Sequence, residues 1–139
     1  MYYEIRYTNM EDKRESALVE SACMLDALGI IANFAKEVLA VKLSLIKETY
    51  PDDLNTYEWF RLTLVDSFVG DNGKETKLKY GIAIQAPSMD EAPVLARNIV
   101  DEGYDMELRA VAKINFDKVI ITSSTGADEF RVYDSKVAD

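Results

Sequence analysis

The chain has 139 residues, which is enough for one compact domain or for two small interlocked ones. Its formal net charge of −9 weighs against proteins that coat duplex DNA or anionic membranes, since those proteins neutralise phosphate groups. There is no histidine, and Cys23 is the single cysteine. The sequence therefore excludes Ser-His-Asp and Cys-His nucleophilic sites, imidazole metal ligands, an internal disulfide and a thiolate metal cluster.

The composition is that of a folded protein of the cytoplasm. Hydrophobic residues make up 48% and charged residues 29%, which is ordinary for a globular domain. No apolar run approaches the roughly 20 residues that span a bilayer. The first residues, Met-Tyr-Tyr-Glu, lack the basic start and apolar core of a signal peptide. We therefore expect a cytoplasmic protein, or one delivered from the cytoplasm, that does not act in a membrane.

The chain begins with a predicted pair of strands. Over residues 2–8 inward and outward side chains alternate, with Tyr3, Ile5 and Tyr7 on one face, the period of two that is typical of a half-buried strand. A short charged link, residues 9–14, leads to a second strand over residues 15–22. Cys23 follows, and we expect a small buried side chain there.

A helix is then predicted with Asp26 as its N-cap. Its apolar stripe has helical spacing and consists of Leu28, Ile31, Phe34, Ala35 and Val38. The third strand follows, with apolar side chains at Val41, Leu43 and Leu45. Residues 50–54 close this unit, and residues 55 and 56 are the only linker to the next.

Residues 57–86 predict a second and clearer hairpin. Residues 57–69 alternate as one strand, and residues 75–86 alternate as its antiparallel partner. Between them, Asn72-Gly73 is a strong signal for a tight turn, because both residues tolerate positive φ.

A second helix follows Pro87. Ser88 and Glu91 fit the spacing of a capping box. Pro93 favours Asp90 as the N-cap instead, because Pro93 then lies in the first turn, where no N–H is required. The buried stripe is Val94, Leu95, Ile99 and Val100, and Gly103 is expected just past the helix end.

The last strand of this half is predicted over residues 106–114. Its inward side chains are expected to be Met106, Leu108, Ala110, Ala112 and Ile114, and its outward ones Glu107, Arg109, Val111 and Lys113. Phe116, Val119 and Ile120 form an apolar plug behind it.

The two halves read as copies of one ββαβ unit. A gapless alignment places Tyr2 on Trp59, Tyr3 on Phe60 and Ile5 on Leu62. We predict an α+β fold of two tandem ββαβ repeats, residues 1–56 and 57–121, with residues 122–139 as a tail or an edge strand. The strand order in each repeat is second, first, third, and the repeats are related by a pseudo-twofold axis. Either they join into one mostly antiparallel six-stranded sheet with both helices on one face, or two three-stranded layers pack helix against helix.

The second repeat carries a family resemblance. The string Trp59-Phe60-x-Leu62…Asp71-x-Gly73-Lys74…Ile84-x-Ala86-x-Ser88-x-x-Glu91-Ala92 resembles a domain-of-unknown-function family of Bacteroidetes and their phages and mobile elements. The resemblance implies a tandem pair of such units over residues 2–121. The first copy lacks the Gly-Lys turn and has Leu25-Asp26-Ala27 at the helix start. No activity is established for the family, so the resemblance transfers no catalytic residue.

A candidate binding face lies on the second predicted sheet, opposite its helix. It combines one aromatic with basic residues: Trp59, Arg61, Lys77, Lys79, Arg109 and Lys113. Open sheets of this kind bind single-stranded nucleic acid by stacking bases on aromatics while cations follow the backbone. The same pattern also fits an ordinary solvated face, and the matching face of the first copy has Tyr2, Glu4, Arg6 and Lys42.

Acidic residues cluster in two places. Asp52 and Asp53 form one group, and Asp101, Glu102, Asp105 and Glu107 form another. Paired carboxylates serve acid–base chemistry or Mg²⁺, but no phosphate-gripping loop lies near either group. We interpret both groups as solvated charges and expect no metal and no cofactor.

The sequence thus favours a non-enzymatic accessory protein that acts through protein–protein contacts and self-association. Trp, Tyr and Arg often dominate interface energy, and open sheet edges assemble readily. Single-stranded nucleic-acid binding is the alternative, and the charge of −9 counts against it. The resemblance adds the expectation of a phage or mobile-element protein acting in the host cytoplasm.

Overall fold

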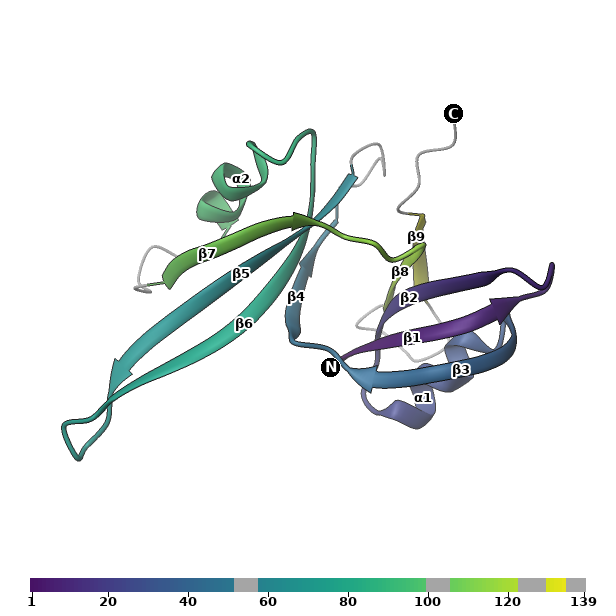
Figure 1. Cartoon of the computed structure of the whole chain (residues 1–139), viewed down its shortest axis with the longest axis horizontal. Coiled ribbons are helices and arrows are strands. Elements are labelled where there is room, and N and C mark those ends of the chain that lie inside the picture. The colour runs from purple at the N-terminus through teal and green to yellow at the C-terminus, as the bar shows by residue number, and fades with distance from the viewer. Residues whose placement is uncertain (52–57, 100–105, 123–129, 135–139) are drawn as a thin grey trace. The chain divides into compact units, whose positions relative to one another are not determined.

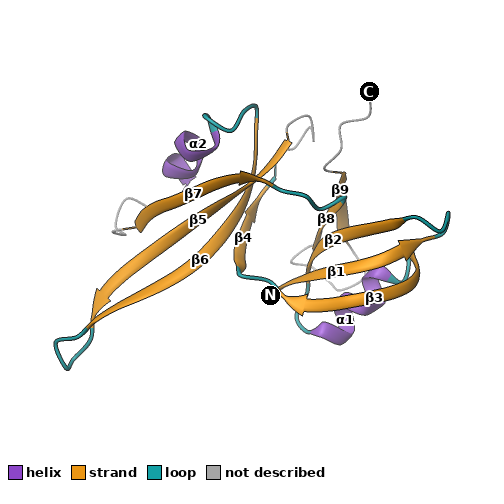
Figure 2. Cartoon of the chain, viewed as in Figure 1, coloured by secondary structure: helices purple, strands orange, loops and turns teal. Residues whose placement is uncertain are grey.

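The computed structural model describes residues 1–51, 58–99, 106–122 and 130–134 (Figure 1). The chain divides into two compact units, one of Met1–Leu45 with Asn115–Asp139 and one of Ile46–Ile114. Each unit contains one sheet and one helix, and strands dominate (Figure 2). The predicted α+β class is confirmed.

The first unit is built on a five-stranded sheet. In spatial order its strands are β3 (Ala35–Leu43), β1 (Tyr2–Asn9), β2 (Arg14–Glu20), β8 (Lys118–Thr122) and β9 (Phe130–Asp134). Neighbouring strands are antiparallel, except that β2 and β8 are parallel. The sheet is therefore mixed.

One face of this sheet packs on helix α1 (Met24–Ile31). Alternate residues of β1 and β2 point to the helix because directly opposed residues of antiparallel strands share a face. The core they form consists of Tyr3, Ile5, Tyr7, Ala17, Val19, Ala27, Ile30, Ile31 and Ile120.

The second unit is built on a four-stranded mixed sheet. In spatial order its strands are β4 (Ile46–Tyr50), β6 (Glu75–Ala86), β5 (Glu58–Val69) and β7 (Met106–Lys113). Only β4 runs parallel to its neighbour. Helix α2 (Ala92–Ile99) packs on one face, over a core of Phe60, Leu62, Leu64, Ile82, Ile84, Ala86, Ala92 and Ala96.

Two strands join a sheet formed by the other half of the chain. β4 follows β3 of the first unit after only two residues, yet it pairs with β6. β8 follows β7 of the second unit, yet it pairs with β2. Neither the predicted single six-stranded sheet nor the two three-stranded layers is correct, because β4 extends one sheet to four described strands and β8 with β9 extends the other to five.

Within each sheet the first three strands of the half follow the predicted order. β1 lies between β2 and β3, and β5 lies between β6 and β7. The N–H of Ser44 donates to the carbonyl of Tyr2 at 2.8 Å, and that of Ile114 donates to the carbonyl of Trp59 at 3.0 Å. An alanine in the N-terminal half of each helix is buried, Ala27 in α1 and Ala92 in α2.

Both sheets also contain a bulge at the same step. The register shifts between Arg6 and Tyr7 where β1 meets β3, and between Thr63 and Leu64 where β5 meets β7. One extra residue enters the outer strand each time, Leu39 in β3 and Arg109 in β7.

The two hairpin turns are built alike. In the second, Gly70 donates its N–H to the carbonyl of Lys74 at 3.0 Å, and Gly73 donates to Gly70 at 2.9 Å with φ of 78°. In the first, Asn9 donates to Lys13 at 2.8 Å, and Asp12 donates back to Asn9 at 3.0 Å with φ of 63°. Four residues separate β1 from β2 and five separate β5 from β6, so the first link is the shorter one, as its sequence indicates.

The first helix is shorter than its apolar stripe predicts. It begins after Cys23, which is the N-cap and is exposed rather than buried, and it ends at Ile31. Asp26 lies in the first turn and is not the cap. Phe34 and Val38 lie beyond the helix, because residues 35–43 form strand β3 beside β1.

The start of α2 is closer to prediction. Pro93 lies in its first turn as expected, but the side chain that binds a free N–H is Ser88, whose hydroxyl accepts from Glu91 at 3.3 Å. Gly103 and Val100 lie outside the described residues. Both helices have eight residues, and within the described chain no helix is long and apolar enough to cross a membrane.

Candidate functional site

The predicted binding face is only partly assembled. Trp59 is 1% exposed, so its ring is not available for stacking, and Arg61 is half-buried. Lys77, Lys79, Arg109 and Lys113 are exposed. The strand register places Trp59, Arg61, Lys77 and Lys79 on one face, opposite the helix core, as predicted.

The bulge in β7 separates the other two residues from that pattern. Lys113 is paired with Phe60 and so faces the α2 side of the sheet, where it forms an ion pair with Glu58 at 3.0 Å. Val111, expected to point outward, packs against the core under α2. Arg109 is the extra residue of the bulge and pairs with Glu107 at 3.3 Å. The six residues therefore do not form one surface.

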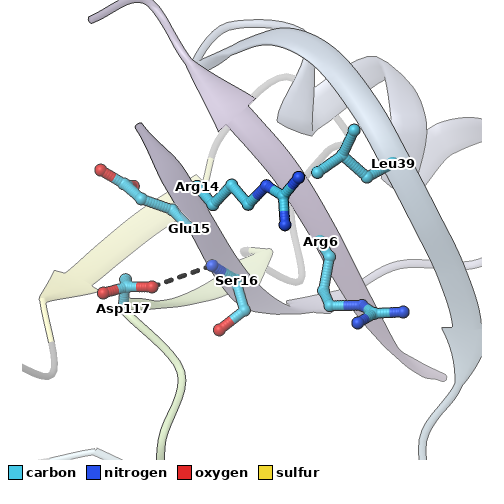
Figure 3. A pocket seen from close by; sticks show the side chains of 6 residues that line it. All are labelled: Arg6, Arg14, Glu15, Ser16, Leu39 and Asp117. Atoms are coloured by element: carbon cyan, nitrogen blue, oxygen red, sulfur yellow. Dashed lines mark hydrogen bonds between the residues drawn. The ribbon is translucent and has the colours of Figure 1, made fainter. Parts of the chain in front are cut away.

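A hollow that the sequence did not predict lies in the first unit. It has a volume of about 440 Å³ and is lined by Arg6, Arg14, Glu15, Ser16, Leu39 and Asp117. Figure 3 shows both arginine side chains extending from their strands towards the β3 side of the sheet. We call these six residues the arginine hollow.

The hairpin and the bulge bring the arginine hollow together. Arg6 on β1 is directly opposite Ser16 on β2, and Arg14 lies two residues further along β2, opposite Thr8. Diagonal neighbours of this kind are about 7–8 Å apart, within reach of long side chains. Leu39 is the extra residue of the β3 bulge, and bulges redirect side chains beside binding sites.

The two carboxylates of the hollow are engaged by other groups. Glu15 accepts hydrogen bonds from the hydroxyl of Tyr7 at 2.8 Å and from the amide of Asn9 at 2.5 Å, and Lys118 lies 3.8 Å away. Burial, reinforced by this hydrogen bond and by the negative charge of Glu15, raises the pKa of Tyr7 far above its usual value. Asp117 accepts the N–H of Ser16 at 2.9 Å.

The sequence pattern missed this site for one reason. Arg6 stood on the face expected to be solvated, but Arg14 fell inside the residues assigned to a link, so the two were not placed on one face. Counting the turn as Asn9–Lys13 would have put Arg14 opposite Thr8 and thus beside Arg6.

The outer edge of β3 is a second exposed feature. β3 stands at the end of its sheet, and its outer edge pairs with no strand among the described residues. The strand has nine residues, and Leu39 and Leu43 on it are 46% and 54% exposed, with Leu45 just beyond at 63%. Long apolar edges of this kind invite pairing with another strand.

The predicted acidic clusters give little further information. Asp52, Asp53, Asp101, Glu102 and Asp105 lie outside the described residues. β9 occupies the C-terminal stretch for which a tail and an edge strand had both been considered. No protein family, curated protein or solved structure matches the chain. The resemblance of the Trp59–Ala92 motif stays a prediction.

Proposed function

We propose that this chain is a non-enzymatic interaction protein that self-associates by pairing the β3 edges of two copies. The outer edge of β3 carries the proposal. The outward N–H and C=O groups of this nine-residue strand can hydrogen-bond to a further strand. Leu39 and Leu43, which are exposed, would be buried by that pairing. Pairing two identical edges about a twofold axis also closes the assembly at a dimer.

Charge complementarity favours one register. Leu39, the extra residue, shifts the alternation, so that Glu37 and Lys42 lie on the same face, opposite Thr8 and Glu4 of β1. An antiparallel β3–β3 pair centred on Leu39 and Ala40 places Glu37 of each copy opposite Lys42 of the other. Opposite charges across strands each contribute about 0.2–1 kcal/mol, and like charges oppose pairing by similar amounts.

Charge reversal tests this register. Glu37→Lys and Lys42→Glu each put like charges opposite each other twice in a homodimer, so each variant alone is expected to dissociate at concentrations where the natural chain is dimeric. A mixture of the two variants restores both attractive pairs and is expected to dimerise. Analytical ultracentrifugation across a concentration series measures all three cases.

The outcomes separate the surface from the register. A natural chain that stays monomeric at the highest concentration would rule out self-association through any edge. A dimer that neither reversal weakens would place the interface elsewhere. Lys47→Glu, an exposed reversal on β4, is the matched control and is expected to leave the dimer intact.

Single-stranded nucleic-acid binding is the alternative proposal from another class. Exposed Lys77 and Lys79 support it, whereas the burial of Trp59 removes the stacking ring on which it depended. Fluorescence anisotropy of a labelled oligonucleotide at low and moderate salt tests it, since phosphate contacts weaken as salt rises. Binding lost in Lys77→Gln with Lys79→Gln would promote this function over self-association.

We also propose that the two halves are tandem ββαβ repeats related by a pseudo-twofold. The matched carbonyls of Tyr2 and Trp59, the bulges at Leu39 and Arg109, and the parallel added strands β8 and β4 support the duplication. A phage or mobile-element origin and action in the host cytoplasm stay predictions that rest on the family resemblance.

A further inference from the structure

We propose that the arginine hollow binds a small phosphate monoester, with Arg6 and Arg14 gripping the phosphate and Leu39 contacting the apolar part of the ligand. Two guanidinium groups line this one hollow. Within the described chain, neither Arg6 nor Arg14 forms an ion pair or a side-chain hydrogen bond, although both line the hollow.

The nearest carboxylates do not neutralise these arginines. Glu15 is already bound by Tyr7 and Asn9 and lies near Lys118, and Asp117 is bound by the N–H of Ser16. Figure 3 shows the carboxylates of Glu15 and Asp117 at the opposite side of the hollow from the two guanidinium groups. The two guanidinium groups therefore form the cationic side of the hollow, and an anion is the ligand that fits it. Glu37 of β3 lies on the same face, opposite Thr8, but within the described residues it forms no ion pair with either arginine.

The geometry selects phosphate over carboxylate. One guanidinium fork satisfies a planar carboxylate with two parallel hydrogen bonds. Two forks on diagonal positions of neighbouring strands present donors from two directions, and a phosphate monoester has three terminal oxygens and nearly two negative charges with which to accept from both. The hollow has about 440 Å³, which is the size of a small-molecule site, and Leu39 supplies an apolar wall.

This proposal does not rest on self-association. Arg6 and Arg14 lie on β1 and β2, away from the outer edge of β3 that pairs in the dimer, whereas Leu39 belongs both to that edge and to the hollow. Glu37→Lys would add a cation to the face of the hollow, so binding is measured on the natural chain at a concentration where ultracentrifugation finds it monomeric.

The test is an NMR titration of the ¹⁵N-labelled full chain at pH 7.5 and constant ionic strength, with phenyl phosphate as the probe. The side-chain Nε–H signals report each arginine directly. We expect saturable shifts at Arg6 and Arg14 and no change at Arg97, which lies exposed on α2 in the other unit. Benzoate, which replaces the phosphate by a carboxylate, and methyl phenyl phosphate, a diester with one charge, are expected to bind at least about tenfold more weakly, the loss of one charge-assisted contact.

Matched variants then assign the contacts. Arg6→Gln and Arg14→Gln are each expected to weaken phenyl phosphate about tenfold, whereas Arg97→Gln, which removes the same charge elsewhere, leaves affinity unchanged. Backbone amide spectra establish that each variant is folded. Arg6→Lys and Arg14→Lys keep the positive charge but lose the guanidinium fork, and they are expected to bind with intermediate affinity. If a glutamine variant does not fold, the lysine variant at the same position is measured in its place.

Three results would overturn the proposal. Shifts that rise linearly with ligand and spread equally to Arg97 would reduce the effect to general ionic screening. Benzoate binding as tightly as phenyl phosphate would make the hollow a carboxylate site. The third result is tight binding of a phosphodiester, either methyl phenyl phosphate or a single-stranded oligonucleotide without a terminal phosphate. If either binds as tightly as the monoester, the arginines bind a phosphodiester backbone instead.

Discussion

Individual residues of the core were predictable where alternation alone decides burial. Tyr3, Ile5 and Tyr7 are buried as their spacing indicates, and so are Phe60 and Leu62. Trp59 was not, because alternation gives the face of a residue but not what covers that face. Arg14 was missed for a related reason: the position of a turn decides which side chains become neighbours across strands.

Tyr7 gives a prediction about alkaline stability. The folded state raises its pKa through burial and the hydrogen bond to Glu15, so the folded chain keeps a proton that the unfolded chain loses near pH 10. Stability from this group is complete below that pH and falls as the pH rises further. Tyr50 behaves likewise, since burial and the contact with Glu48 raise its pKa to about 12.

Urea denaturation between pH 8 and pH 11 measures the effect. Tyr7→Phe is expected to lower the free energy of unfolding by about 1 kcal/mol at neutral pH, the net value of one hydrogen bond. It should also flatten the decline above pH 10, because the variant no longer retains that proton. An alkaline decline equally steep in Tyr7→Phe would show that Tyr7 does not couple to folding.

Elements were predicted well where local signals agree. β6 was expected at residues 75–86 and has those bounds, because alternation, the Gly73 turn and Pro87 all indicate the same limits. The region after Ile31 was predicted as helix because Phe34 and Val38 continue a helical spacing. The free edge of β1 competes for that segment, and residues 35–43 pair along this edge as β3 instead of continuing the helix.

Two glycines give opposite expectations for the same substitution. Gly73→Ala is expected to reduce stability by about 1–2 kcal/mol, because φ of 78° strains any residue with a Cβ. Gly29→Ala is expected to increase it by about 1 kcal/mol, since Gly29 lies inside α1 and an added Cβ meets open space. Thermal and urea unfolding measure both. A loss of stability in Gly29→Ala would mean that α1 is not helical there in solution.

At the scale of the whole molecule, the sequence predicts two similar halves but not how strands are shared between them. Residues 118–122 form a short apolar segment and residues 46–50 a largely polar one, and nothing local states which sheet either segment joins. Parallel pairing with a distant strand depends on which sheet edge is free in the folded chain. A single sequence does not show which edges are free.

The shared strands predict how fragments behave. Cutting the chain within residues 52–57 yields one piece with β1–β4 and one with β5–β9, and each piece lacks a strand of its own sheet. Each piece alone is expected to lack the cooperative unfolding of the full chain, whereas an equimolar mixture should regain it and elute as one complex. Circular dichroism and size-exclusion chromatography measure this. A folded, cooperative piece 1–51 would contradict the need for β8.

The pairing of β2 with β8 also sets the order of events on the ribosome. Ser16 and Asp117, which hold the start of that pairing, are 101 positions apart in the chain. Protein synthesis adds about 5–20 residues per second, so the edge of β2 is made roughly 5–20 s before its partner strand β8. Leu18 and Val19 are fully buried in the finished protein. During that interval β8 does not yet lie beside them. The N-terminal sheet is thus started first and completed last, and nascent chains are the stage at which this protein most needs a chaperone.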